Sequence, residues 1–152
     1  MERTPIVLVE VDRGDGVTVL GEGVEVLDRE EGDGPLVEAP SLVRVDEEGQ
    51  GVYVLFFSSH CWMTSLYRVG WAVSRGNVTG PYVRGAEGGR LMWTGDGRVN
   101  LTAPGGATAV VTDAKAGEGS MVFHANCEEG RCLFERGWRV EGGVVSLVEG
   151  VS

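Results

Sequence analysis

The sequence EAPSLV at Glu38–Val43 is followed by YVLFFSS at Tyr53–Ser59, and the same plan is repeated once further along the chain. The second copy is APGGATAVV at Ala103–Val111, followed by MVFHA at Met121–Ala125. Each copy contains a proline-led first strand and a hydrophobic second strand that ends in small or polar residues. A repeat of about 65 residues is the size of one four-stranded propeller blade. We therefore predict an all-β fold with β-propeller architecture.

Apolar residues elsewhere alternate with polar ones or form short runs, and nowhere do they keep a helical period over three turns. Glycine accounts for 25 of the 152 residues and often falls in pairs, which indicates turns between many short strands. We predict no helix. The predicted strands are Ile6–Val11, Val17–Leu20, Val24–Leu27, Ser41–Val45, Val52–Ser58, Tyr67–Val73, Tyr82–Arg84, Leu91–Trp93, Ala107–Thr112, Ser120–Ala125, Cys132–Arg136 and Val144–Val148.

The chain is predicted to form one partial propeller domain over residues 1–152. Residues 1–35 provide the outer strands of one blade, residues 36–90 the blade that carries Glu38, and residues 91–152 the final blade. Propellers close with typically four to eight blades, so about two and a half blades cannot close into a ring. Open faces and unpaired strand edges favour association with another chain.

Charge narrows the range of partners. The formal net charge is -10 and the isoelectric point is near 4.6, whereas binding to nucleic acid or to an anionic membrane needs clustered basic residues. No apolar run approaches the ~20 residues that span a bilayer. The apolar stretch at Ile6–Val11 is interrupted by Glu10 and is too short for the core of a signal peptide.

Cys127 and Cys132 flank the sequence EEGR, which is typical of a hairpin tip. A disulfide between them is geometrically reasonable, and two reduced thiols are the alternative. Two glycosylation sequons begin at Asn77 and Asn100. A disulfide and sequons together favour a secreted parent protein.

Glu38 is a carboxylate among apolar neighbours at the start of a strand that should be buried. Such surroundings suit a carboxyl group to donate a proton, and a partly exposed glutamate at a strand start is the alternative. Four aspartates lie in glycine-rich turns and are predicted to be turn residues, namely Asp12, Asp15, Asp28 and Asp33.

The segments quoted above, with VGWAVS at Val69–Ser74 and TGPY at Thr79–Tyr82, follow the order and spacing of the C-terminal blades of glycoside hydrolase family 43. The sequence resembles fungal members of this family over about Thr4–Val148. The resemblance implies a five-bladed β-propeller with its active site at the mouth of the central tunnel. It also implies inverting cleavage of arabinofuranosyl or xylosyl linkages in plant polysaccharides, no cofactor and an extracellular location.

By this resemblance Glu38 matches the general acid. The family also uses an aspartate base and a second aspartate that tunes the acid, and no aspartate of this chain stands in the corresponding sequence context. Inversion needs an acid and a base about 6.5 to 9.5 Å apart. We therefore expect the chain alone to be inactive. The alternatives are a non-catalytic carbohydrate-binding protein or truncated pseudoenzyme, and a small β-sandwich interaction module.

Four residues are predicted to bind the saccharide. His60 and Trp62 follow the second strand of the Glu38 blade, where a loop should approach the tunnel mouth, although Trp62 also suits a loop aromatic that covers the core. His124 matches a strand position where the family often has histidine, with a core histidine as the alternative. Arg131 matches a family arginine, with a solvated hairpin arginine as the alternative. Gly106 stands where many relatives carry a histidine near an axial metal or water site, so no metal site is predicted.

Overall fold

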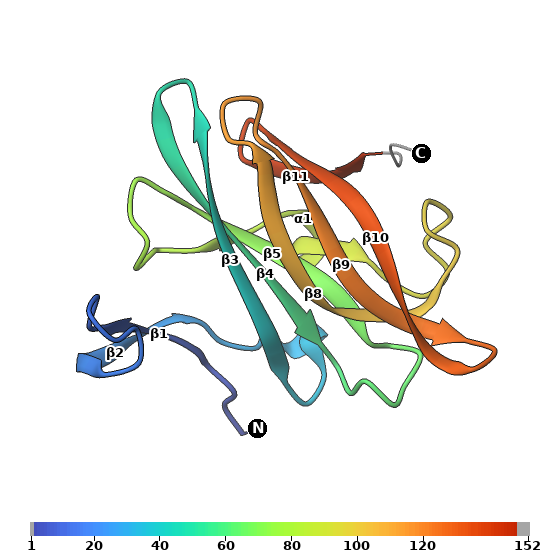
Figure 1. Ribbon diagram of the computed structural model, residues 1–152. Helices are drawn as coiled ribbons and strands as arrows, with labels where there is room; N and C mark the ends of the chain where they lie inside the picture. Colours follow the sequence, from blue (N-terminus) through green and yellow to red (C-terminus); the bar gives the residue numbers. More distant parts are fainter. Residues whose placement is uncertain (1, 149–152) are drawn as a thin grey trace.

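A computed structural model describes residues 2–148 as three antiparallel sheets (Figure 1). We name them the N-terminal hairpin, the central sheet and the C-terminal sheet. The hairpin contains β1 (Ile6–Val11) and β2 (Val19–Leu27); the central sheet contains β3 (Val37–Glu47), β4 (Gln50–Ser59), β5 (Arg68–Arg75), β6 (Val83–Arg84) and β7 (Arg90–Met92); the C-terminal sheet contains β8 (Thr102–Asp113), β9 (Glu118–Cys127), β10 (Gly130–Glu141) and β11 (Val144–Val148).

Strand order within the two large sheets follows the chain. The central sheet runs β3-β4-β5-β6, with β7 also pairing with β5, and the C-terminal sheet runs β8-β9-β10-β11. Each sheet is thus a meander of the kind that forms a propeller blade, and the predicted all-β, partial-propeller fold is confirmed. Within the described residues, helix is limited to one turn at η1 (Glu31–Asp33) and another at α1 (Ala86–Gly89), two short turns that the sequence did not predict. Within residues 2–148, no helix is long and apolar enough to cross a membrane.

One strand differs from the prediction. The segments Val17–Leu20 and Val24–Leu27 belong largely to a single strand, β2, instead of two. Gly21 has a φ of 72°, a left-handed conformation that glycine adopts without steric cost. The pairing register with β1 shifts between Leu8 and Glu10, so the extra residues are accommodated as a bulge and the ladder continues.

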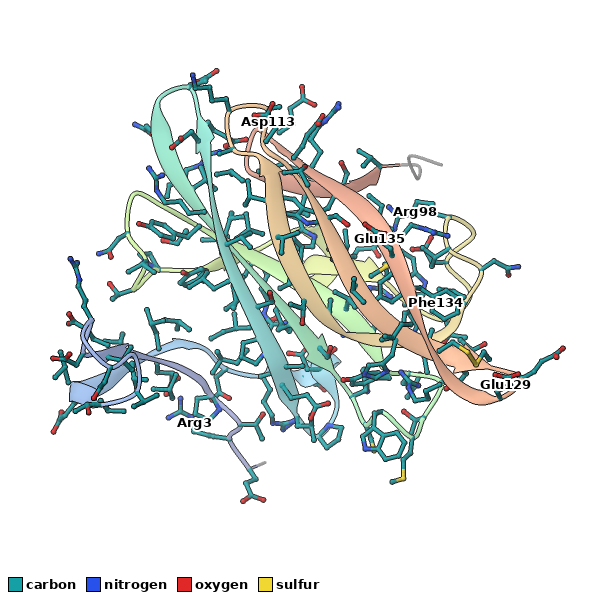
Figure 2. All side chains as sticks on the ribbon, in the orientation of Figure 1. Arg3, Arg98, Asp113, Glu129, Phe134 and Glu135 are labelled. Atoms are coloured by element: carbon teal, nitrogen blue, oxygen red, sulfur yellow. A yellow bond between two sulfur atoms is a disulfide. The ribbon has the colours of Figure 1, made fainter. Side chains whose placement is uncertain are left out.

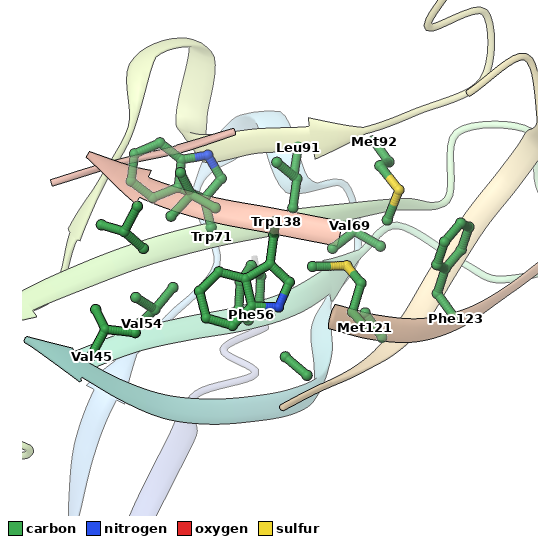
Figure 3. Packing of buried hydrophobic residues seen from close by; sticks show 14 of the residues in the cluster. Val45, Val54, Phe56, Val69, Trp71, Leu91, Met92, Met121, Phe123 and Trp138 are labelled. Carbon is green, nitrogen blue, oxygen red and sulfur yellow. The ribbon is translucent and has the colours of Figure 1, made fainter. Parts of the chain in front are cut away.

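The main core lies between the central and C-terminal sheets (Figure 3). Val54 and Phe56 of β4 belong to it, as does Trp138 of β10, which is fully buried. The rings of Phe56 and Trp138 are 5.3 Å apart between centroids. Burial of each such side chain stabilises the fold by about 1.5–3 kcal/mol, so this interface joins the two sheets firmly. Trp71 also belongs to this core.

A second core lies on the opposite face of the central sheet. Leu55 and Phe57, which alternate with the residues of the main core along β4, pack with Ile6 and Leu27 of the N-terminal hairpin. Because successive residues of a strand point to opposite faces, burial of both faces requires a continuous apolar run. This explains why the sequence VLFF in β4 shows no polar alternation.

The outward face of the C-terminal sheet is uncovered by any other part of the described chain. Val110, Val122 and Leu133 are exposed on it by 56%, 44% and 74%. The N-terminal hairpin is exposed in the same way, with Val17 at 75% and Val19 at 54%. Apolar surfaces of this kind usually mark contacts with another element or chain.

Asp33, predicted to be a turn residue, is a buried carboxylate that forms ion pairs. It lies in η1 but is only 2% exposed. The Arg84 guanidinium lies 2.8 Å from its Oδ2 atom and 4.6 Å from the centre of the Phe57 ring, and Arg68 lies 3.6 Å from its Oδ1 atom. The buried carboxylate is therefore paired with two arginines of the central sheet and fastens the segment before β3 to that sheet.

Replacing Asp33 with asparagine should remove the buried counter-charge of Arg68 and Arg84, and Arg84 then keeps only the exposed Glu30 at 3.4 Å. We expect the free energy of unfolding to fall by about 3–5 kcal/mol in urea denaturation. Arg139→Gln is the matched control, because it breaks an exposed pair with Glu118 and should cost about 1 kcal/mol or less. Equal, small losses in both variants would contradict this account of Asp33.

Candidate active site

Glu38 lies at the start of β3, where the strand departs from regular pairing. The register with β4 shifts between Glu38 and Ser41, and Ala39 has a φ of 49°. A non-glycine residue in this region costs on the order of 1–3 kcal/mol, and such strain gathers at functional sites. The bulge sets the direction of the partly buried Glu38 side chain, whose Oε1 atom accepts a 2.8 Å hydrogen bond from the hydroxyl of Tyr67.

Tyr67 is the central residue that sequence reasoning missed. It ends the loop between β4 and β5 and is only 2% exposed. Its ring stacks on the imidazole of His124 at 5.9 Å between centroids, with 20° between the planes. Burial raises the pKa of Tyr67 to about 12, and the neighbouring Glu38 carboxylate adds to this effect. The phenol therefore remains a hydrogen-bond donor at every pH at which the fold would operate.

Two adjacent glycines of β8 make room for these rings. A Cβ atom at Gly105 would lie 1.9 Å from the Tyr67 ring, and one at Gly106 would lie 2.3 Å from Nε2 of His124. The dipeptide that follows Pro104 thus allows two rings to rest directly on the backbone. The space that a side chain at position 106 would need is occupied by the imidazole of His124.

Arg131 fixes His124 from the neighbouring strand. Its Nε donates to Nδ1 of the imidazole at 2.7 Å, and its terminal nitrogens donate to the Asn126 side chain at 2.7 Å and to the Ala103 carbonyl at 2.8 Å. Burial, followed by the charge of Arg131, lowers the pKa of His124, so the imidazole is neutral at neutral pH. Arg131 is therefore not a solvated hairpin arginine, and most of its donors are directed at protein atoms.

The other two predicted binding residues lie outside this cluster. His60 contacts the Gly32 carbonyl at 3.1 Å, and its pKa is lowered by burial and then by the charge of Arg68. It therefore belongs with the Asp33 group. Trp62 is 53% exposed, and its loop also exposes Met63 and Leu66 by 73% and 61%. This loop ends at Tyr67, so its apolar side chains are close in sequence to the cluster.

The β9–β10 hairpin forms the edge of the site. Cys127 and Cys132 form a disulfide behind its tip, which Glu129 marks in Figure 2, and Asp113 marks the opposite end of the sheet. The structure thus has the bonded form of the two alternatives for these cysteines. The remaining cysteine, Cys61, is free and partly buried.

The cluster has one carboxylate. Among the described residues, no aspartate or second glutamate forms a hydrogen bond or ion pair with Glu38, Tyr67, His124 or Arg131. Over the same residues, no group of three or more His, Cys, Asp and Glu side chains is arranged to hold a metal ion. The arrangement presents one carboxylate, oriented by the hydroxyl of Tyr67.

A separate hollow of about 400 Å³ lies between the outer strands of the two sheets, and Trp71 and Trp93 line it. Three arginines line it too, each already paired with a carboxylate: Arg84 with Asp33, Arg90 with Glu87, and Arg98 with Asp96. The hollow therefore has aromatic surface but little unpaired charge.

No protein-family model matches this sequence, and no curated protein matches it. Solved structures do match its fold. An exo-1,5-α-L-arabinanase from a bovine ruminal metagenomic library aligns with 94% of this chain and 48% of its own, at a TM-score of 0.69 and 22% identity. A xylan β-1,4-xylosidase from Bacillus halodurans aligns with 95% of this chain and 27% of its own, at a TM-score of 0.71 and 19% identity.

A GH43 protein from Bacillus licheniformis aligns with 94% of this chain and 27% of its own, at a TM-score of 0.68 and 18% identity. The chain spans less than half the length of each of these structures. The likeness confirms the resemblance to glycoside hydrolase family 43 at the level of fold. The three sheets correspond to part of a propeller of that type.

The charge state of His124 gives a direct test of the cluster. We expect His124 to titrate below its ordinary value of about 6.5 in an NMR titration, and we expect its pKa to rise in Arg131→Gln, because both its burial and the nearby positive charge decrease. The contribution of neutral His124 to the free energy of unfolding is complete above the pKa that His124 has in the unfolded chain. It is lost as the pH falls through the lower pKa that His124 has in the folded protein. His60, the other histidine, serves as the internal control. An unchanged His124 titration in the variant would contradict the arrangement.

The space above Gly105 gives a second test. Gly105→Ala places a methyl group inside the volume of the Tyr67 ring and should reduce stability by about 1–3 kcal/mol in thermal or urea denaturation. Gly97→Ala, where an added Cβ atom meets nothing within 4 Å, is the matched control and should have little effect. Equal stability of the two variants would show that Tyr67 does not lie on Gly105.

Proposed function

We propose that Glu38 is the general acid of an inverting glycosidase site that acts on arabinofuranosyl or xylosyl linkages of plant polysaccharides. The observation that carries the proposal is the position of Glu38: it stands at the bulged start of the first strand of one blade, next to the first strand of the following blade, and a buried tyrosine orients it. The arabinanase and xylosidase folds that match this chain support this class of substrate.

The base belongs to a carboxylate outside the described cluster. Inversion requires that base to lie about 6.5 to 9.5 Å from the acid, on the far side of the sugar. Further blades against the open hairpin and the open face of the C-terminal sheet would bring such a group to the tunnel mouth. We therefore propose that the chain by itself turns over substrate poorly and associates through its unpaired edges.

The remaining predicted residues enter the proposal with different roles. His124 contacts the saccharide beside Glu38, and Arg131 acts mainly by holding His124 in place. Trp62, from its exposed loop, provides an aromatic face for a sugar ring. His60 approaches the saccharide only if the substrate reaches the Asp33 group. The disulfide and the two sequons support an extracellular location.

A non-catalytic carbohydrate-binding protein is the second candidate. The single carboxylate and the exposed Trp62 loop favour it, because binding needs aromatic and polar contacts but no base. The two candidates differ in what Glu38→Gln should do. It removes turnover if Glu38 is the acid, and it leaves saccharide binding unchanged if the site only binds.

Azide allows the acid to be tested without the base. Azide attacks the anomeric carbon in place of activated water, a C–N bond forms as the glycosidic C–O bond breaks, and Glu38 gives its proton to the departing phenolic oxygen. With phenyl arabinofuranoside or xyloside and azide, we expect phenol release by the wild type and at least a 100-fold lower rate in Glu38→Gln.

Dinitrophenyl glycosides provide the control, because this leaving group departs without a proton. Wild type and Glu38→Gln should release dinitrophenol at similar rates in azide. Equal rates on the phenyl glycosides, or no azide-dependent release by the wild type, would overturn the assignment of Glu38.

A further inference from the structure

Two buried hydroxyl groups, those of Ser58 and Tyr67, lie beside Glu38. The Tyr67 hydroxyl donates to Oε1 of Glu38 at 2.8 Å, and Oγ of Ser58 accepts a 2.8 Å hydrogen bond from the Gly106 backbone N–H. Ser58 also acts on Tyr67, because its hydroxyl lowers the pKa of the phenol while burial and Glu38 raise it.

The hydrogen bond between Tyr67 and Glu38 is shielded from bulk water. Ser58 is fully buried and Tyr67 is 2% exposed, and Ser58 is the residue that pairs with Glu38 across β3 and β4. The Tyr67 ring is held between the Gly105 backbone and the His124 imidazole. In such surroundings a hydrogen bond is electrostatically stronger than it is in water.

This arrangement makes the two oxygens of Glu38 different. Oε1 already accepts the Tyr67 proton, and a second proton on the same oxygen would oppose that bond. We propose that Tyr67 is the positioning residue for Glu38: it occupies Oε1 and leaves Oε2 to carry the proton that passes to the leaving oxygen. The inference rests on the proposed role of Glu38 as the acid.

Tyr82 is a matched comparison within the same protein. Burial raises its pKa to about 12 as well, but its hydroxyl donates to the Val78 carbonyl at 2.7 Å instead of a carboxylate. Tyr82→Phe therefore removes the hydroxyl of a partly buried tyrosine that, like Tyr67, directly precedes a strand of the central sheet, and it does so without touching Glu38. Any effect that Tyr67→Phe shows and Tyr82→Phe lacks belongs to the contact with Glu38.

The closing experiment compares these variants in the azide assay. We expect Tyr67→Phe to lose about tenfold in phenol release from phenyl glycosides, because the acid is no longer oriented, and to match the wild type on dinitrophenyl glycosides. Tyr82→Phe should match the wild type on both. A Tyr67→Phe rate equal to wild type on phenyl glycosides, or an equal loss on both substrates, would overturn the proposal.

A second readout works without turnover. The shielded Tyr67 hydroxyl proton should give a downfield NMR signal that moves in Glu38→Gln and is unaffected in Tyr82→Phe. An unmoved signal in Glu38→Gln overturns the proposal. A moved signal with no Glu38-dependent turnover overturns the acid assignment but leaves the hydrogen bond intact.

Discussion

Two neighbouring strands, β3 and β8, begin with the same irregularity, and the site depends on it. Each gains one residue at an Ala-Pro pair, where Ala39 and Ala103 take left-handed φ values of 49° and 53°. The strands then lie side by side, with the Ala109 N–H donating to Ser41 at 3.0 Å. The main core behind them compensates for the strain of both bulges. Rigid packing of two blades therefore makes a strained, oriented carboxylate sustainable.

The site depends on two glycines, because only a residue without a Cβ atom leaves room for the rings that pack there. Gly105 and Gly106 let the Tyr67 and His124 rings rest on the backbone of β8, so residues from both sheets meet around Glu38 without an intervening layer. Arg131 then joins His124 to the Ala103 carbonyl at the bulge. Stability and proposed function use the same contacts, because the residues that orient the acid also join the two blades.

Much of the fold follows from the sequence, and less of the site does. Glycine pairs and apolar alternation predicted most strands, and β4 is a continuous apolar run because both of its faces are buried. Glu38 was found through family resemblance, and His124 and Arg131 do come together near it. The sequence did not predict a role for Tyr67, because its hydrogen-bond partner, Glu38, is 29 residues away and no local pattern predicts that contact. The ion pairs of Asp33 were not predicted for the same reason, since its two arginine partners come from the distant strands β5 and β6.

Fold likeness to an arabinanase and a xylosidase gives the architecture, and the proposed chemistry rests on the cluster at the starts of β3 and β8. The central claim is that this cluster is where a saccharide binds. The most direct measurement is amide NMR of the chain during titration with arabinotriose and xylotriose. The account predicts shifts centred on Gly105, Gly106 and His124. Shifts confined to the hollow between Trp71 and Trp93, or no shifts with either saccharide, would contradict it.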